Sequence, residues 1–129
     1  MRTPEISGTL TFFYYYNLEE TARFYKDIMH FELKLDLDWV KIFEISKGSH
    51  LGLVNSEMGS HKPSDDKPVR IQMIVADAQA WFDYFKAIGV PTTRDKLYVG
   101  TLLKIKTCTV KDPGGYTIEI CEYTTPYGI

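Results

Sequence analysis

The stretch KDPGGYTIEICEY, residues 111–123, decides how this sequence is interpreted. Asp-Pro-Gly-Gly is typical of a tight turn, because proline and glycine supply the backbone angles that turns need. The residues that follow alternate between apolar and polar, which predicts a strand with two different faces. Ile118 and Ile120 fall on one face, and Glu119 falls on the other with Cys121. The glutamate therefore belongs either to an ordinary solvated face or to a site.

The composition is that of one globular domain. The chain has 129 residues, of which 44% are hydrophobic and 25% charged, with a net charge of −2 and a pI of about 5.9. This balance offers no basic surface for nucleic acid, and no apolar run is long enough to cross a membrane. Two cysteines and a first segment without the apolar core of a signal peptide predict a cytoplasmic protein.

The predicted elements occur twice in the same order. The first module, about 1–58, has a strand, a helix and three short strands, at 8–16, 17–30, 31–37, 39–46 and 50–55. After a polar loop at 56–68, the second module, about 66–129, repeats this order at 69–75, 77–89, 96–100, 102–110 and 116–123. Asn17 and Asp77 are the predicted helix N-caps. The pattern predicts an α+β fold in which two βαβββ modules form a single domain, 1–129.

Two motifs carry a resemblance to a known family. NLEETARFYKDIMHFEL, residues 17–33, is a capped helix with a Phe-Tyr pair, and KDPGGYTIEI, residues 111–120, is a closing hairpin that contains a glutamate. With the repeated module, they resemble the vicinal oxygen chelate superfamily, which includes glyoxalases, bleomycin-resistance proteins and extradiol dioxygenases. The resemblance covers nearly the whole chain. It implies a curved mixed sheet around a cleft, with the helices on the opposite face.

The resemblance also implies where a metal ion would bind. Enzymes of this family hold a divalent cation with His, Glu or Gln at four cleft positions, which fall here on Leu10, Gly52, Arg70 and Glu119. Only Glu119 could bind a metal, because leucine and glycine have no side-chain donor and arginine stays protonated. His50 shares the strand face of Gly52 and is a conceivable substitute. We predict no metal ion and no other cofactor, and an ion pair in which Arg70 stands beside Glu119 in place of the cation.

The sheet face opposite the helices is the predicted ligand site. On the first strand, alternate residues from Leu10 share that face, and Trp39 and Tyr98 are expected near it. A two- or four-residue turn at 112–115 would bring Lys106 and Cys108 onto the face of Glu119. A solvated sheet face and rings that fill the core are the alternatives. The predicted ligand-binding set is Leu10, Phe12, Tyr14, His50, Arg70, Gln72, Lys104, Lys106, Cys108 and Glu119.

Two classes of function remain open. The first is a metal-free protein, similar to bleomycin-resistance members, that binds a small aromatic or cationic molecule. The second is a metal-dependent lyase or dioxygenase of the glyoxalase type with an altered site, in which Glu119 is the catalytic base. The sequence favours the first, because Glu119 has no metal or acid partner besides Arg70. The resemblance further implies a homodimer.

Overall fold

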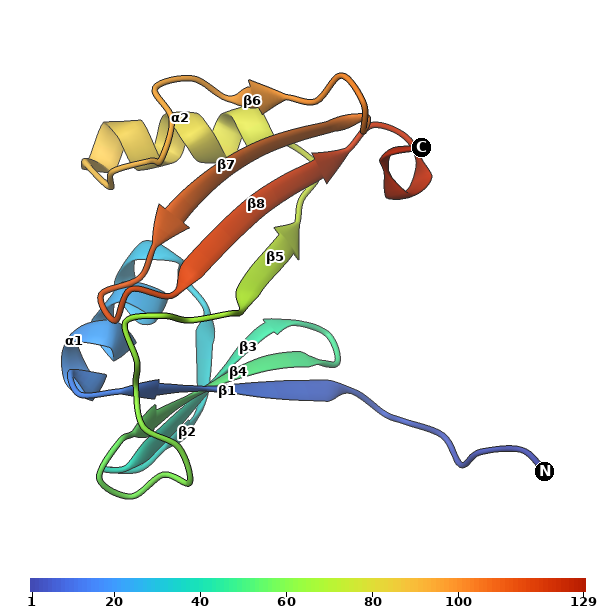
Figure 1. The fold of residues 1–129 in the computed structure, drawn as a ribbon. Coiled ribbons are helices and arrows are strands. Elements are labelled where there is room, and N and C mark those ends of the chain that lie inside the picture. The colour runs from blue at the N-terminus through green and yellow to red at the C-terminus, as the bar shows by residue number, and fades with distance from the viewer. The chain divides into compact units, whose positions relative to one another are not determined.

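The computed structural model describes residues 1–129 and divides into two compact units, Met1–Asp65 and Asp66–Ile129. Each unit contains one βαβββ module, which confirms the α+β prediction. The strands pair within each module as a mixed four-stranded sheet, in the orders β1-β4-β3-β2 and β5-β8-β7-β6, and not as one continuous sheet. In each module a helix lies across one face of the sheet (Figure 1). No helix is long and apolar enough to span a membrane.

The first module packs its core between one sheet face and its helical segment. Its elements are β1 (Thr9–Tyr15), α1 (Leu18–Arg23), the π-helical turn η1 (Phe24–Ile28), β2 (Glu32–Asp36), β3 (Val40–Ser46) and β4 (Ser49–Asn55). β1 runs parallel to β4, and the other neighbours are antiparallel. Alternate residues of β1, β3 and β4 are buried on the helix side, with the apolar face of the helical segment. These core residues are Phe13, Tyr15, Phe43, Leu51, Leu53, Leu18, Ala22, Tyr25 and Met29.

The helical segment of this module differs from the regular helix expected at 17–30. It begins after Asn17 as predicted, but the Asn17 side chain donates to the Glu20 carboxylate at 3.1 Å and makes no cap bond to the backbone. From residue 24 the helix widens into η1. Phe24 and Tyr25 are both buried there, although neighbours in an α-helix point about 100° apart. The Tyr25 ring stacks on Phe31, with centroids 6.2 Å apart.

The second module has clearer helix signals. Its elements are β5 (Arg70–Ile74), α2 (Ala78–Ile88), β6 (Tyr98–Val99), β7 (Ile105–Lys111), β8 (Thr117–Tyr123) and the short 3₁₀ helix η2 (Pro126–Gly128). The Asp77 side chain caps α2 by accepting a hydrogen bond from the amide of Ala80 at 3.0 Å, and Gly89 ends it at a φ of 78°. The core lies between α2 and one sheet face. It contains Met73, Ala78, Phe82, Phe85, Cys108, Val110, Ile118 and Ile120.

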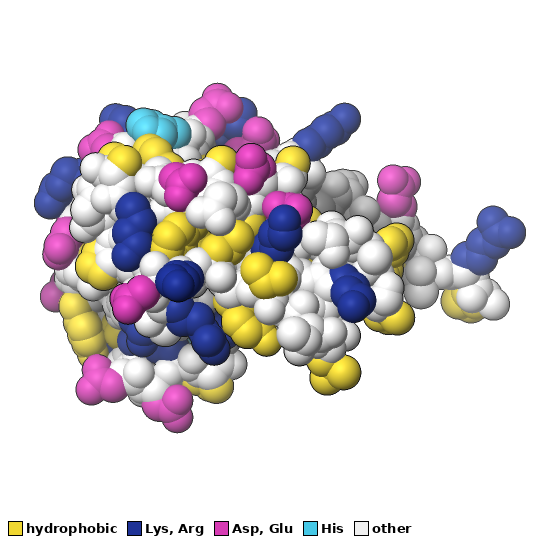
Figure 2. Space-filling view, turned by 90° about the horizontal axis from the view of Figure 1, so that it is seen from above, with side chains coloured by type: hydrophobic (Ala, Val, Ile, Leu, Met, Phe, Trp, Pro, Cys, Tyr) yellow, Lys and Arg dark blue, Asp and Glu magenta, His cyan; other side chains and the backbone are white.

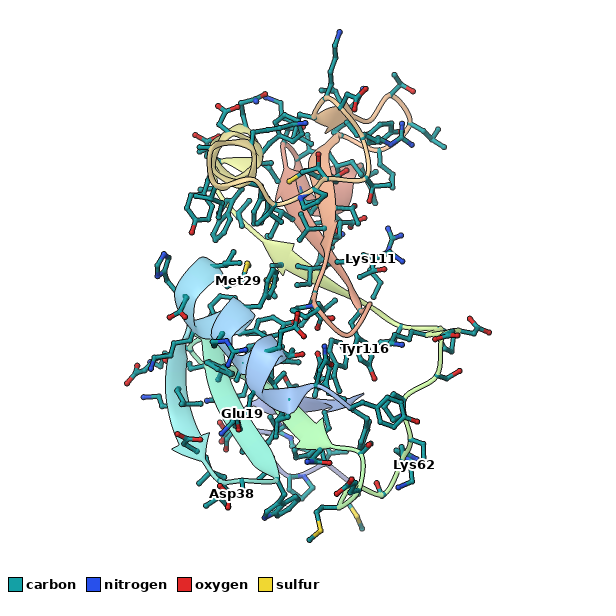
Figure 3. All side chains as sticks on the ribbon, turned by 90° about the vertical axis from the view of Figure 1, so that its left-hand side faces the viewer. Glu19, Met29, Asp38, Lys62, Lys111 and Tyr116 are labelled. Atoms are coloured by element: carbon teal, nitrogen blue, oxygen red, sulfur yellow. The ribbon has the colours of Figure 1, made fainter.

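The hairpin between β7 and β8 corrects the predicted register. Its loop has three residues between Asp112 and Tyr116, whose backbones bond to each other at 3.0 Å, and Figure 3 labels Lys111 and Tyr116 at its two ends. Cys108 therefore stands opposite Ile120, and Thr109 stands opposite Glu119. A two- or four-residue turn would have paired Cys108 with Glu119. Since side chains alternate along a strand, this one-residue difference exchanges the two faces of β7.

The turn itself explains the odd loop length. Gly115 has a φ of 88°, and three-residue hairpin loops need a left-handed residue at this place. The Asp112 carboxylate is buried and accepts hydrogen bonds from the amides of Gly114 at 3.0 Å and Tyr116 at 2.9 Å. These bonds satisfy the N–H groups of two loop residues that are not paired within the sheet. Asp112 therefore specifies the loop, and through it the face on which each residue of β7 lies.

Candidate functional site

The predicted pair of Arg70 and Glu119 is present and belongs to a larger polar network. Nη1 of Arg70 lies 2.8 Å from Oε2 of Glu119, well within the range of strong pairing. The other carboxylate oxygen accepts a hydrogen bond from the amide of Gln72, and Gln72 in turn accepts one from the Tyr123 hydroxyl at 2.6 Å. Both oxygens of Glu119 are thus engaged. The side chain of Glu119 is 15% exposed and that of Arg70 is 57% exposed.

This network lies on the sheet face opposite α2. β5 and β8 run parallel with Arg70 beside Thr117 and Gln72 beside Glu119, so these four residues share a face. Thr107 and Thr109 of β7 lie on the same face, because they stand opposite Cys121 and Glu119. The segment 93–98 completes the wall of a pocket of about 510 Å³. The lining residues are Arg70, Thr93, Arg94, Lys96, Tyr98, Ile105, Thr107, Cys108, Thr109, Lys111, Thr117 and Glu119.

Three predicted site residues of this module do not face that network. Lys106 stands opposite Glu122, and Cys108 stands opposite Ile120 in the core on the α2 side. Lys104 precedes β7, where its backbone bonds to Thr124 and Gly128. The assignment of Lys106 and Cys108 to the face of Glu119 was wrong, because it depended on an even-numbered turn. Lys104 lies outside the strand and does not line the pocket. Cys108 touches the pocket only from the core side of β7.

Neither cysteine is suited to nucleophilic chemistry. Burial raises the pKa of the Cys108 thiol to about 11. The pKa of Cys121 is also raised, mainly by burial and further by the charge of Glu119. Both thiols are free, and a thiolate is the reactive form. A catalytic role for either cysteine is therefore not supported at neutral pH.

The first module has an apolar groove on the sheet face opposite its helix. Phe12 and Tyr14 lie on this face as predicted, and Trp39 lies beside them. The groove has a volume of about 460 Å³, and its lining is almost entirely apolar. The lining residues are Phe12, Tyr14, Leu35, Leu37, Trp39, Val40, Ile42, Val54, Met58, Gly59 and Ser60. Aromatic walls of this kind suit an organic ligand.

A glycine lets one ring of this groove lie against the sheet. Phe12 of β1 is paired with Gly52 of β4. A Cβ added at Gly52 would lie 2.5 Å from Cδ1 of Phe12 and 2.7 Å from its Cε1, which is closer than van der Waals contact allows. The Phe12 ring therefore occupies the space over position 52, where a side chain would otherwise stand.

The remaining predicted residues of the first module lie on this face but outside the groove. Leu10 is 40% exposed and is paired with His50 of β4. Nε2 of His50 lies 3.6 Å from the Glu44 carboxylate on β3. One histidine and one carboxylate do not make a transition-metal site, which needs three or four ligands. Among residues 1–129 no group of three His, Cys, Asp or Glu side chains is placed to hold a metal ion.

A buried lysine supports the loop that carries Trp39. Lys41 of β3 is 6% exposed, and its ammonium donates to Asp36 and lies 3.4 Å from the Glu19 carboxylate of α1. Figure 3 labels Glu19 on that helix. The hydrogen bond to Asp36 raises the pKa of Lys41, burial opposes this, and Glu19 raises it further. Lys41 thus links α1 to Asp36, the last residue of β2. The neighbours of Asp36, Leu35 and Leu37, both line the groove.

Sequence reasoning missed several residues that line the two hollows. Leu35 reaches the groove because a bulge between Leu33 and Leu35 changes the register of β2, so that Leu33 and Leu35 lie on opposite faces despite their even spacing. Met58 comes from a segment that reads as a polar linker. In the second module, Arg94, Lys96 and Lys111 were missed. For Arg94 and Lys96, the cluster of charged residues in TTRDK, 92–96, was the signal in the sequence that could have indicated a charged site.

Comparisons with known proteins agree with this architecture. The family model of the Glyoxalase/Bleomycin resistance protein/Dioxygenase superfamily matches residues 10–120. No curated protein matches the sequence significantly. A lactoylglutathione lyase from Agrobacterium tumefaciens is 18% identical with a TM-score of 0.75, over 93% of this chain and 96% of that one.

Two further solved structures are similar. A glyoxalase/bleomycin resistance protein/dioxygenase from Nocardioides is 13% identical with a TM-score of 0.76, over 95% of this chain and 86% of that one. A virulence protein from Salmonella typhimurium is 18% identical with a TM-score of 0.71, over 96% and 100% of the two chains. At such identities the likeness establishes the fold alone.

Proposed function

Because this chain belongs to the Glyoxalase/Bleomycin resistance protein/Dioxygenase superfamily, we propose that it binds a small organic molecule without a resident catalytic metal ion. The observation that carries the proposal is the 2.8 Å pair between Arg70 and Glu119. A guanidinium beside a carboxylate places one positive charge against Glu119, where metal-binding relatives would hold a divalent cation. It leaves no vacancy for the ion and cannot act as a ligand.

The donor set supports this reading. The resemblance to metal-binding relatives places ligands at Leu10, Gly52, Arg70 and Glu119, and three of these four side chains have no atom that can bind a metal. His50, the conceivable substitute, is paired with Glu44. The residues present therefore do not fit a divalent metal ion.

The alternative of a lyase or dioxygenase that uses Glu119 is less well supported. A general base must approach the proton that it removes to hydrogen-bond distance. Both oxygens of Glu119 already accept hydrogen bonds, from Arg70 and from Gln72. These donors hold the carboxylate against the sheet. The arrangement suits a residue that shapes the floor of a binding pocket.

Three broader properties belong to the same proposal. We propose that the two modules make one glyoxalase-like domain and that two chains associate as a homodimer, as the resemblance implies. A cytoplasmic location is in keeping with two free cysteines that form no disulfide. Light scattering at micromolar concentration tests the dimer, and a monomer at all concentrations would contradict it.

The decisive experiment combines metal analysis with ligand identification. Protein purified without chelator should carry far less than one equivalent of Zn, Ni, Mn or Fe, and native mass spectrometry should show a bound organic species or accept one from a metabolite extract. The Arg70→His variant is the matched control, because it places a second possible ligand beside Glu119; with only two ligands it should take up metal weakly and lose it on dialysis. About one equivalent of metal in the natural protein, lost together with ligand binding on chelation, would overturn the proposal.

A further inference from the structure

The pocket of the second module has an unusual charge for this protein. Four cationic side chains line it, Arg70, Arg94, Lys96 and Lys111, against the single carboxylate of Glu119. The whole chain carries a net charge of −2, so this hollow is opposite in sign to the average surface. Figure 2 shows a group of Lys and Arg side chains close together on the visible face, with acidic side chains spread more widely.

Three of these four cations have no counter-ion. Glu119 is already taken by Arg70. No carboxylate lies within 4.0 Å of the charged groups of Arg94, Lys96 or Lys111, since none of the ion pairs of this chain includes them. Cations gathered in a hollow with protein walls focus a positive potential. Their mutual repulsion is relieved when an anion enters.

The segment that carries two of these cations is held in place by hydrogen bonds. The amide and hydroxyl of Thr93 both donate to the carbonyl oxygen of Thr109 on β7, at 2.9 Å and 3.3 Å. The Thr92 hydroxyl donates to the carbonyl oxygen of Arg94 at 2.8 Å. The Arg94 guanidinium lies over the ring of Tyr98, 4.8 Å from its centroid. Arg94 is therefore stacked and tethered at the pocket wall, which reduces the entropy lost on binding.

Hydroxyl groups complete the lining. Thr109 stands opposite Glu119, and Thr117 stands opposite Lys111, so both point to the pocket face. Hydroxyls and basic side chains together are the usual donors to phosphate and carboxylate oxygens. The volume of about 510 Å³ lies within the range of small-molecule sites and leaves room for more than a bare oxyanion.

We infer that this pocket binds a small organic anion through a carboxylate or phosphate group held by Arg94, Lys96 and Lys111, with the Arg70–Glu119 pair as its floor. The inference rests on the proposed function and names the chemical class of the ligand. It also counts against a cationic ligand in this module. Arg94 supplies a planar fork for two oxygens, whereas the two lysines act as point charges.

Matched aromatic probes test the charge requirement. We expect phenyl phosphate or benzoate to bind in calorimetric titration, whereas benzyl alcohol and benzylamine, which are neutral and cationic, bind at least about tenfold more weakly. The preference between the first two identifies the phosphate or the carboxylate as the group recognised. Affinity should fall as sodium chloride is raised, because ions screen exposed charges.

Variants locate the site. We expect the affinity for the preferred anion to fall by about tenfold in each of the variants Arg94→Gln, Lys96→Gln and Lys111→Gln, because each removes one charge-assisted contact. Lys106→Gln is the control, because Lys106 is on the same strand as Lys111 but on its opposite face, and it should leave the affinity unchanged. Urea unfolding checks that all four variants are folded.

The outcomes separate this inference from the proposed function. If benzyl alcohol binds as tightly as the anions, the anion site is overturned while small-molecule binding stands. An equal loss of affinity in Lys106→Gln, or no loss of affinity in the three pocket variants, would also overturn the anion site. The same conclusion would follow if inorganic phosphate bound as tightly as phenyl phosphate and its affinity were unchanged in the variants. If no probe binds, the anion site is rejected. The proposed function is then tested separately, by the native mass spectrometry experiment described above.

Discussion

The two modules share a backbone plan but differ in the chemistry of the sheet face opposite the helix. Phe12 and Gln72 lie at the same distance before the helix N-caps Asn17 and Asp77, and they pair in parallel with Gly52 and Glu119 respectively. In the first module a ring fills the place that the Glu119 carboxylate takes in the second. One module thus presents an apolar groove and the other a cationic pocket.

The helix-side faces of the two modules are, in contrast, alike. Both are made of alternating aliphatic and aromatic residues that are buried against a helix, such as Leu51 and Leu53 in one module and Ile118 and Ile120 in the other. Burial of apolar area stabilises the fold wherever it occurs. The faces that pack against the helices are therefore constrained by stability, while the opposite faces are free to take different chemistry.

The largest expected effect concerns the turn that sets the register of the second module. Asp112→Ala removes an acceptor that is 4% exposed and leaves the amides of Gly114 and Tyr116 without their partner. We expect a loss of about 2–3 kcal/mol in the free energy of unfolding, the cost of unsatisfied buried donors, measured by urea denaturation. Asp112→Asn keeps an acceptor and should lose less.

The first module offers the matched control for this prediction. Its β3–β4 turn contains Lys47 and Gly48, and Lys47 is exposed. Lys47→Ala should change stability by less than about 0.5 kcal/mol. Equal effects at Asp112 and Lys47 would show that the two turns do not differ in the way described.

The next effect tests the contact between Phe12 and Gly52. Gly52→Ala should destabilise the fold by about 1–2 kcal/mol, because the added methyl group meets the Phe12 ring. In a Phe12→Ala background the same change should be neutral or slightly stabilising, since alanine restricts the unfolded chain more than glycine. A double-mutant cycle measures this coupling. The same cost in both backgrounds would refute the idea that the ring occupies the place of a side chain.

A smaller effect is expected at the ion pair of the second module. Arg70→Ala should cost about 0.5–1 kcal/mol, as for other partly exposed pairs, because 57% of the Arg70 side chain is exposed. Glu119→Gln should cost a similar amount, and the double variant should cost less than the sum. Strict additivity of the two changes would mean that the pair contributes nothing to stability.

The smallest effect is a pH dependence confined to the first module. The pKa of Lys41 is raised above its ordinary 10.5, mainly by Asp36, so the folded state holds this proton to higher pH than the unfolded state. Its contribution to stability is fully present below about pH 10.5 and is lost as pH rises through the raised value. The stability difference between the natural protein and Lys41→Met should therefore shrink at alkaline pH. A constant difference across that range would contradict this account.

The sequence alone was sufficient for the order of elements, the ends of α2 and the helix-side core outside β7, whose two faces were exchanged in the prediction. Alternation, the Asp77 cap and the Gly89 stop are local signals, because each depends on residues only a few positions apart. Asn17 marks the start of α1, although its side chain makes no cap bond to the backbone. The pair of Arg70 and Glu119 was also predictable, once the resemblance placed both residues at matching positions on neighbouring strands. Its extension to Gln72 and Tyr123 was not predicted.

Tertiary structure alone decided which face of β7 lies on the same side of the sheet as Glu119. It also decided which residues complete the walls of the groove and of the pocket. The buried Asp112 and the left-handed Gly115 select a three-residue loop, and one residue more or less reverses every side chain of the strand. That choice sends Lys106 and Cys108 to the helix side and brings Thr107 and Thr109 to the pocket. Likewise Leu35, Arg94 and Lys96 reach their sites through a bulge and a tethered loop, whose course depends on contacts between segments far apart in the chain and not on any periodicity within them.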